Sequence, residues 1–167
     1  MLSINFWVKA LFVLVLPLSA YAAEKTGPKI GQVSPNIVGR TLDERWYRLE
    51  KDLGTPKVIN FFWVGCVPCR KEMPELAVLE KHYPKVKFMA VHTERETPEN
   101  VINFIKSING APSNIVLTLG GMQEYFQYLG LPHTILLDKN NVVLMNLSGY
   151  TAENMQKLNT ALKQLEK

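Results

Sequence analysis

The chain has 167 residues, of which 47% are hydrophobic and 20% charged, enough for one globular domain with a substantial core. The formal net charge at pH 7 is only +4. Such a small positive excess argues against a nucleic-acid partner. The sequence contains no internal repeat or low-complexity tract that would call for a second domain.

The N-terminus has the pattern of a secretory signal peptide. Lys9 is followed by an apolar run over residues 10–20, and residues 20–22 (Ala-Tyr-Ala) form a small-x-small cleavage pattern. The run is short for a membrane span, although retention as an uncleaved membrane anchor is the alternative. We therefore expect residues 1–22 to direct export and residues 23–167 to form the folded domain.

Hydrophobic periodicity and turn residues divide the rest of the chain into alternating strands and helices. The first half is expected to contain a lead-in arm (24–35), a β-hairpin (37–49), a buried strand (58–63), a helix and a second buried strand (86–91). The second half is expected to contain a helix from Thr97 to Gly110, an extended piece (115–119), a short helix ending at Gly130, a β-hairpin (134–147) and a final helix after Thr151. This order predicts an α/β fold, a mixed central sheet with helices on both sides.

Cys66 and Cys69 are the two cysteines of the chain. The apolar run before them breaks at Gly65, and we expect the following helix to carry both, with their side chains one turn apart and able to form a disulfide. Unpaired N–H groups and the helix dipole favour a thiolate at the first cysteine. Cys66 is therefore the expected nucleophile, and Cys69 the group that resolves a mixed disulfide.

Two other uses of the cysteine pair are less consistent with the sequence. A structural disulfide gains most by closing a long loop, and this pair would close a loop of two residues. A zinc site needs a second pair of ligands, which the histidines at 82, 92 and 133 do not provide by their spacing. The sequence thus indicates a redox pair that requires neither metal nor cofactor.

Two stretches resemble the exported TlpA/ResA-like thiol-disulfide oxidoreductases of the thioredoxin superfamily. One runs from Val58 to Pro74 and contains the Cys-Val-Pro-Cys motif, and the other is Gly-Leu-Pro-His-Thr, beginning at Gly130. The resemblance covers nearly the whole chain after the signal segment. It implies a thioredoxin-like fold in which the predicted hairpin is an N-terminal addition.

The resemblance also implies roles for individual residues. It implies a cis Leu131–Pro132 bond beside the cysteines, with the Leu131 backbone presented to an extended substrate strand. It places Glu72 near the active site, where a carboxylate would influence cysteine ionisation; a solvated glutamate in the first helical turn is the alternative. Asn60 stands where cytosolic thioredoxins have a buried aspartate beneath the cysteines.

Two positions need separate consideration. The family usually has tryptophan immediately before the first cysteine, and Gly65 at that place is expected to leave the surface beside Cys66 less covered. His133 directly follows the expected cis-proline. A loop histidine is usually a surface residue or a backbone cap, so we do not assign it a catalytic role.

The resemblance implies a periplasmic enzyme that reduces protein disulfides, for example in cytochrome c or copper-site assembly. Its partners would be disulfide-containing proteins and a membrane thiol-transfer protein that supplies electrons, with membrane association through the N-terminus if the signal is retained. Two alternatives are a Cu(I)-binding module, with Met73 or His133 near the pair, and a DsbA-like oxidant on the same scaffold.

Overall fold

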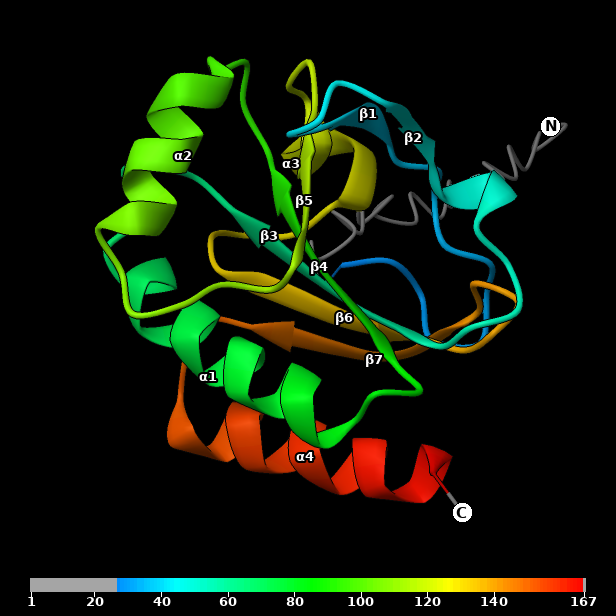
Figure 1. Ribbon diagram of the computed structural model, residues 1–167. Coiled ribbons are helices and arrows are strands. Elements are labelled where there is room, and N and C mark those ends of the chain that lie inside the picture. Colours follow the sequence, from blue (N-terminus) through cyan, green and yellow to red (C-terminus); the bar gives the residue numbers. More distant parts are fainter. Residues whose placement is uncertain (1–26, 167) are drawn as a thin grey trace, which may run out of the picture.

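The computed structural model describes residues 27–166, so the expected signal segment 1–22 lies outside the described residues. Figure 1 shows the order of the elements along the chain. The strands are β1 (Val38–Thr41), β2 (Trp46–Arg48), β3 (Lys57–Phe62), β4 (Lys87–His92), β5 (Asn114–Leu117), β6 (His133–Leu137) and β7 (Val143–Ser148). The helices are η1 (Leu49–Lys51), α1 (Cys69–His82), α2 (Pro98–Lys106), α3 (Met122–Phe126) and α4 (Ala152–Leu165).

The strands form one mixed sheet in the order β2-β1-β5-β4-β3-β6-β7. β3, β4 and β5 are parallel, whereas β6 and β7 are antiparallel to their neighbours. The predicted N-terminal hairpin is present, and its β1 strand pairs antiparallel with β5. The predicted thioredoxin-like α/β fold is therefore confirmed, with β3 buried in the middle of the sheet along its whole length.

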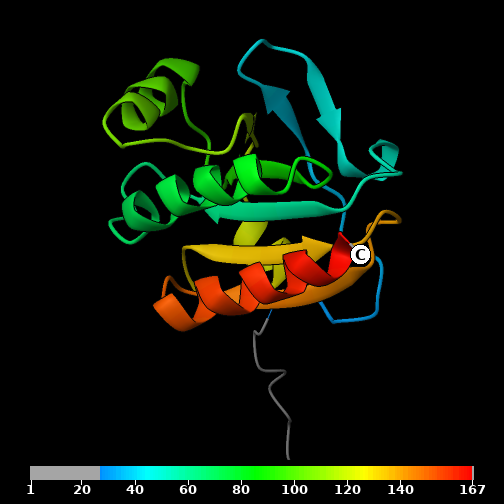
Figure 2. The ribbon, with the colours of Figure 1, turned by 60° about the horizontal axis from the view of Figure 1, so that its bottom comes forward.

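Side chains alternate between the two faces of the sheet, as the two-residue period of a strand requires. In β3, Val58 and Phe62 belong to the clusters beneath α1, α2 and α4, whereas Ile59 and Phe61 belong to the cluster on the opposite face. Figures 1 and 2 show α1 and α4 side by side across one face. The other face is covered by the short α3 and by the segment preceding β1, so the prediction of helices on both faces is confirmed.

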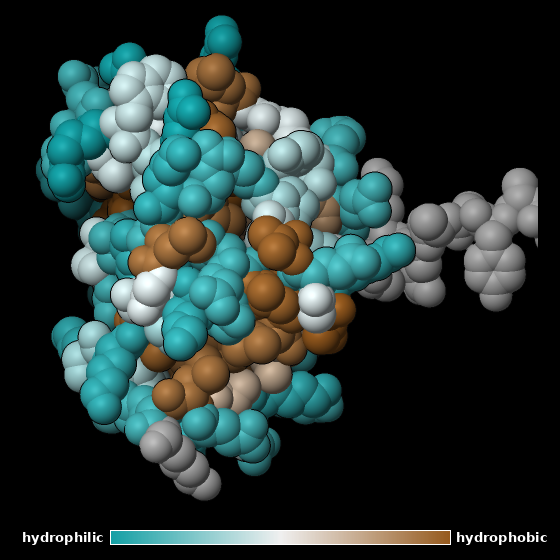
Figure 3. Space-filling model, turned by 90° about the vertical axis from the view of Figure 1, so that its right-hand side faces the viewer, coloured by the Kyte–Doolittle hydropathy of each residue, from teal (hydrophilic) through white to brown (hydrophobic). Residues whose placement is uncertain are grey.

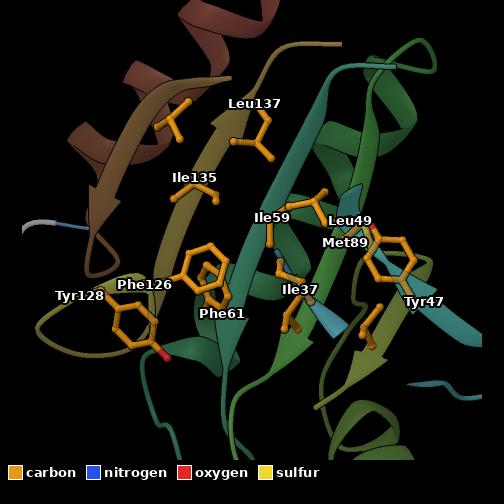
Figure 4. Packing of buried hydrophobic residues seen from close by; sticks show 13 residues of the cluster. Ile37, Tyr47, Leu49, Ile59, Phe61, Met89, Phe126, Tyr128, Ile135 and Leu137 are labelled. Carbon is orange, nitrogen blue, oxygen red and sulfur yellow. The ribbon is translucent and has the colours of Figure 1, made fainter. Parts of the chain in front are cut away.

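Aromatic rings lie among aliphatic side chains in the core on the α3 face (Figure 4). The ring of Phe61 lies 4.7 Å from that of Phe126 and 5.3 Å from that of Tyr128, measured between centroids. All three side chains are buried. Because Phe61 comes from β3 while the other two come from α3 and the loop after it, these contacts fix the segment that leads into Pro132.

Two helices end earlier than the sequence suggests. α2 ends at Lys106 rather than near Gly110. At this end the Ser107 amide donates to the carbonyls of both Asn103 and Phe104, and the Ser107 hydroxyl donates to the Phe104 carbonyl at 2.6 Å. These bonds tighten the last turn and close the helix. α3 ends at Phe126 rather than at Gly130, because Gln127 takes the left-handed conformation with φ 55°.

The carboxyl ends of the three parallel strands lie at one edge of the sheet, and the cysteines follow the end of β3 at that edge. The opposite end of the sheet, at the right in Figure 1, is shown in Figure 3 as a surface of mixed hydrophilic and apolar side chains. In residues 27–166 no helix is long and apolar enough to cross a bilayer.

Candidate active site

A tight turn joins the end of β3 to the first cysteine. The Cys66 amide donates to the Trp63 carbonyl at 2.9 Å, so Val64 and Gly65 occupy the middle of the turn. His92, buried at the end of neighbouring β4, accepts from the Val64 amide through Nε2 at 3.3 Å, while its Nδ1 lies 2.9 Å from the Glu94 carbonyl. The turn that presents Cys66 is thus closed by one hydrogen bond and tied to β4 by another.

Cys66 and Cys69 form a disulfide with a Cα–Cα distance of 5.3 Å. The expectation that one helix carries both cysteines is wrong, because α1 begins at Cys69 and Cys66 lies in the preceding turn. The helix start nevertheless reaches the first sulfur, since the Cys69 amide donates to Cys66 Sγ at 3.2 Å. Cys66 is 7% exposed and Cys69 is fully buried, so the first cysteine alone retains access to solvent.

Glu72 is buried, which rules out the alternative of a solvated first-turn glutamate. Asn60 Nδ2 donates to Glu72 Oε2 at 2.8 Å, and the Thr134 hydroxyl donates to Glu72 Oε1 at 3.0 Å. Asn60 Nδ2 also donates to Thr134 Oγ1 at 2.9 Å. Because Asn60 and Thr134 are cross-strand partners of β3 and β6, the sheet register places both donors beneath α1. We call these three residues the buried carboxyl triad.

The surroundings of Glu72 favour its protonated form. Burial raises the pKa of Glu72 to about 7, although the hydrogen bonds from Thr134 and Asn60 act in the opposite direction. Glu72 lies three residues after Cys69 on α1, so both side chains project from the same side of the helix. The site therefore contains a carboxyl group that can exchange a proton near neutral pH.

Thr134, the last residue of the Gly-Leu-Pro-His-Thr stretch, is a site residue for which the sequence alone indicated no role. Its position is what marks it as part of the site, because it lies two residues after Pro132 and directly opposite Asn60 in the sheet. Single-sequence patterns do not reveal that register. Thr134 therefore links the buried carboxyl triad to the segment that carries the cis-proline.

The Leu131–Pro132 bond is cis, as the resemblance implies. Leu131 packs against the buried cluster that contains both cysteines, and Pro132 is buried just before β6. The ladder between β3 and β6 ends at the pair of Phe61 and His133. The Leu131 backbone therefore lies beyond the paired strands, and its side chain packs against the cluster that contains the cysteines.

His133 is buried, so the expectation of a surface residue or backbone cap is wrong. Its ring stacks on that of Tyr128 with centroids 5.1 Å apart, on the face of the sheet opposite the cysteines. Burial lowers the pKa of His133 to about 4, which keeps the ring neutral. The sequence could not show this, because strand alternation beyond Pro132 decides which face His133 occupies.

The expectation that Gly65 leaves the surface beside Cys66 less covered does not take account of Trp63. The ring of Trp63 lies directly over Gly65, where an added Cβ would be 2.4 Å from the ring atom Cζ3. A tryptophan two positions earlier thus occupies the space above the residue that precedes Cys66. Only glycine at position 65 leaves room for this arrangement.

The alternative of a copper site receives partial geometric support. Met73 is buried in the same cluster as Cys66 and Cys69, whereas His133 lies on the other face of the sheet and cannot join them. Within the part of the chain described here, no group of three or more His, Cys, Asp or Glu side chains is arranged to hold a metal ion.

We expect Glu72 to make the stability of the oxidised protein decrease as pH rises. The pKa of Glu72 in the folded protein, about 7, lies above its ordinary value of 4.5. The stability that Glu72 contributes is therefore fully present below pH 4.5 and is lost as the pH rises through about 7. The loss is roughly 3 kcal/mol at about 1.4 kcal/mol per pKa unit. Glu72→Gln should remove this slope.

Urea unfolding at about pH 5 and about pH 8 measures the effect as the difference between parent and variant. Taking the difference is necessary because His133, with its lowered pKa, contributes a slope of the opposite sign in both proteins. Glu99→Gln, an exposed acid at the start of α2, is the control and should leave the slope unchanged. If parent and Glu72→Gln differed in free energy of unfolding by the same amount at both pH values, Glu72 would not be a buried carboxyl that changes protonation between them.

Comparison with known proteins agrees with this geometry. A family model described as Redoxin matches residues 29–164. The chain is 29% identical over 144 residues to the thiol-disulfide oxidoreductase ResA of Geobacillus thermodenitrificans, covering 83% of this chain and 82% of that protein. It is 27% identical over 125 residues to the thioredoxin-like protein YneN of Bacillus subtilis, covering 74% of each.

Solved structures share the fold. The thioredoxin domain of a thiol-disulfide oxidoreductase from Bacteroides vulgatus superposes with a TM-score of 0.70 at 23% identity, covering 83% of this chain and 98% of that one. A thiol:disulfide interchange protein from Bacteroides sp. gives 0.68 at 24% identity, covering 81% and 89%. With its matching family model and its disulfide at the start of α1, the chain belongs to the Redoxin family and is a thiol-disulfide oxidoreductase of the TlpA/ResA-like branch of the thioredoxin superfamily.

Proposed function

We propose that this chain is an exported reductase that transfers electrons from Cys66 and Cys69 to disulfides of periplasmic proteins. The observation that carries the proposal is the unequal exposure of the two sulfurs at the helix start. Cys66 retains access to solvent and accepts a hydrogen bond from the Cys69 amide, whereas Cys69 is fully buried. An attacking and a resolving cysteine need this difference.

In the reduced protein, the Cys66 thiolate attacks one sulfur of a substrate disulfide. A mixed disulfide forms, and the other substrate sulfur leaves as a thiolate that takes up a proton. Cys69, after losing its proton, then attacks Cys66 Sγ, which releases the second substrate thiol. The protein is left with the Cys66–Cys69 disulfide and has transferred two electrons, so an external dithiol must reduce it again.

The residues around the pair support this sequence of steps. Glu72, with a pKa raised to about 7 by burial, can accept a proton from the resolving thiol and return it later. The Leu131 backbone beside Pro132 lies outside the β3–β6 ladder and can pair with an extended substrate segment. In this proposal Glu72 modulates cysteine ionisation, while Leu131 and Pro132 bind the substrate.

The cellular setting follows from the N-terminal sequence pattern and the family resemblance. The signal-like segment 1–22 would deliver the domain to the periplasm, with membrane association if it is retained. A membrane thiol-transfer protein would supply the electrons. Proteins undergoing cytochrome c or copper-site assembly are the proposed substrates, because these processes need reduced cysteines in an oxidising compartment.

Replacing the resolving cysteine tests the mechanism directly. Cys69→Ser should accumulate a mixed disulfide through Cys66 when it is incubated with a disulfide-bonded substrate, since the second attack is removed. Mass spectrometry under non-reducing conditions detects the adduct, and Cys66→Ser is the matched control that should form none. A folded Cys69→Ser protein that forms no adduct would count against Cys66 as the nucleophile.

The role of Glu72 has its own measurement. An ionised carboxylate near the pair disfavours a thiolate, so Glu72→Gln should make Cys66 more reactive at neutral pH, by roughly 3- to 10-fold. The rate of alkylation of the reduced protein across pH gives the comparison, with Glu99→Gln as control. An unchanged pH profile would reject the tuning role and leave the rest of the mechanism intact.

The direction of electron flow is tested by the reduction potential of the pair, equilibrated against defined thiol–disulfide buffers. We expect a value near or below roughly −230 mV, in the range of glutaredoxins and thioredoxin, which makes the dithiol a reductant. A value near about −120 mV, as in DsbA, would assign the same fold and nucleophile to an oxidant.

A further inference from the structure

We infer that Trp63 determines substrate preference, by providing an aromatic contact for an apolar residue next to the reacting cysteine of the substrate. The inference rests on the proposed function and extends it from the chemistry of Cys66 to the kind of polypeptide that it accepts.

This turn brings Trp63 and Cys66 close together. The hydrogen bond from the Cys66 amide to the Trp63 carbonyl, at 2.9 Å, links the first and last residues of the turn. The Cα atoms at the two ends of such a turn are less than about 7 Å apart. Trp63 is therefore an immediate neighbour of the nucleophile, although three positions separate them in the sequence.

The backbone of Gly65 supports the ring of Trp63. An added Cβ at Gly65 would be 2.4 Å from Cζ3 and 2.5 Å from Cη2 of the ring. Trp63 as a whole residue is nevertheless 44% exposed. An aromatic side chain that is supported from below and exposed above presents a flat apolar surface at low conformational cost.

Other apolar side chains also lie near Cys66. Val67, which directly follows Cys66, is 68% exposed, and Leu131 packs a partly buried side chain against the cluster that contains Cys66. A polypeptide that reaches the sulfur must lie against these side chains. A substrate with leucine, rather than a polar residue, beside its cysteine would bury apolar surface on Trp63.

The structure offers two independent ways to remove this contact. Trp63→Ala deletes the ring. Gly65→Ala keeps the tryptophan and places a methyl group where the ring rests, so the ring has to move. Neither change touches the cysteines or the buried carboxyl triad. Trp46→Ala is the control, because Trp46 is 64% exposed but lies in β2, at the far edge of the sheet.

The test uses two disulfide-bonded peptides that differ only at the residues flanking the cysteine, leucine in one and serine in the other. Single-turnover rates of their reduction by the reduced full-length protein give the preference. We expect the parent to favour the leucine peptide by roughly tenfold, the size of effect typical of partial burial of one apolar side chain. Trp63→Ala and Gly65→Ala should both reduce the preference to within about twofold, with Trp63→Phe intermediate and Trp46→Ala unchanged.

Hydroxyethyl disulfide, which has no apolar side chain, separates this inference from the proposed function. Its rate of reduction reports the reactivity of Cys66 in each variant, including Gly65→Ala next to the nucleophile, and the leucine preference is compared with that rate. Failure of the parent to reduce any disulfide would defeat the proposed function itself. Normal reduction of hydroxyethyl disulfide together with an unaltered leucine preference in Trp63→Ala would overturn the role of Trp63, as would an equal loss of rate on all substrates.

Discussion

A carboxyl group in the apolar interior beneath the disulfide is the constraint around which the site is arranged. An ionisable group at this depth is tolerated only when its hydrogen bonds are satisfied. Asn60 and Thr134 meet this need from two neighbouring strands, while Glu72 comes from the helix that begins at Cys69. The buried carboxyl triad therefore ties α1, β3 and β6 together where the chemistry takes place. The same burial raises the pKa of Glu72 to about 7.

The position of β6 connects this interior to the substrate side. Thr134 donates a hydrogen bond to Glu72, and two residues earlier the chain passes through the cis Leu131–Pro132 bond, where Leu131 packs against the cluster that contains the cysteines. The intervening His133 faces the other side of the sheet and stacks on Tyr128. The consecutive residues Pro132, His133 and Thr134 thus belong, in turn, to the proposed substrate-binding segment, the core on the α3 face and the buried carboxyl triad. A shift of register by one residue would exchange all of these contacts.

Much of this architecture was predictable because local signals agree with one another. Strand alternation, helical periodicity and turn residues located the hairpins, the buried strands and the main helices. The spacing of Cys66 and Cys69 indicated a redox pair. The errors arose where a neighbour distant along the chain, or a single turn, decides the outcome. Gly65 suggested a less covered surface, because the sequence does not reveal that the Trp63 ring folds back over it.

The sequence by itself determined the fold class and the identity of the reactive pair, because periodicity and short motifs are local properties of the chain. Only the tertiary structure decided the environment of each group. Whether Glu72 is solvated or buried, and on which face His133 lies, depend on strand register and helix packing, which bring together residues such as Asn60 and Thr134 from distant parts of the chain. Burial, and with it the pKa, is a property of that three-dimensional neighbourhood.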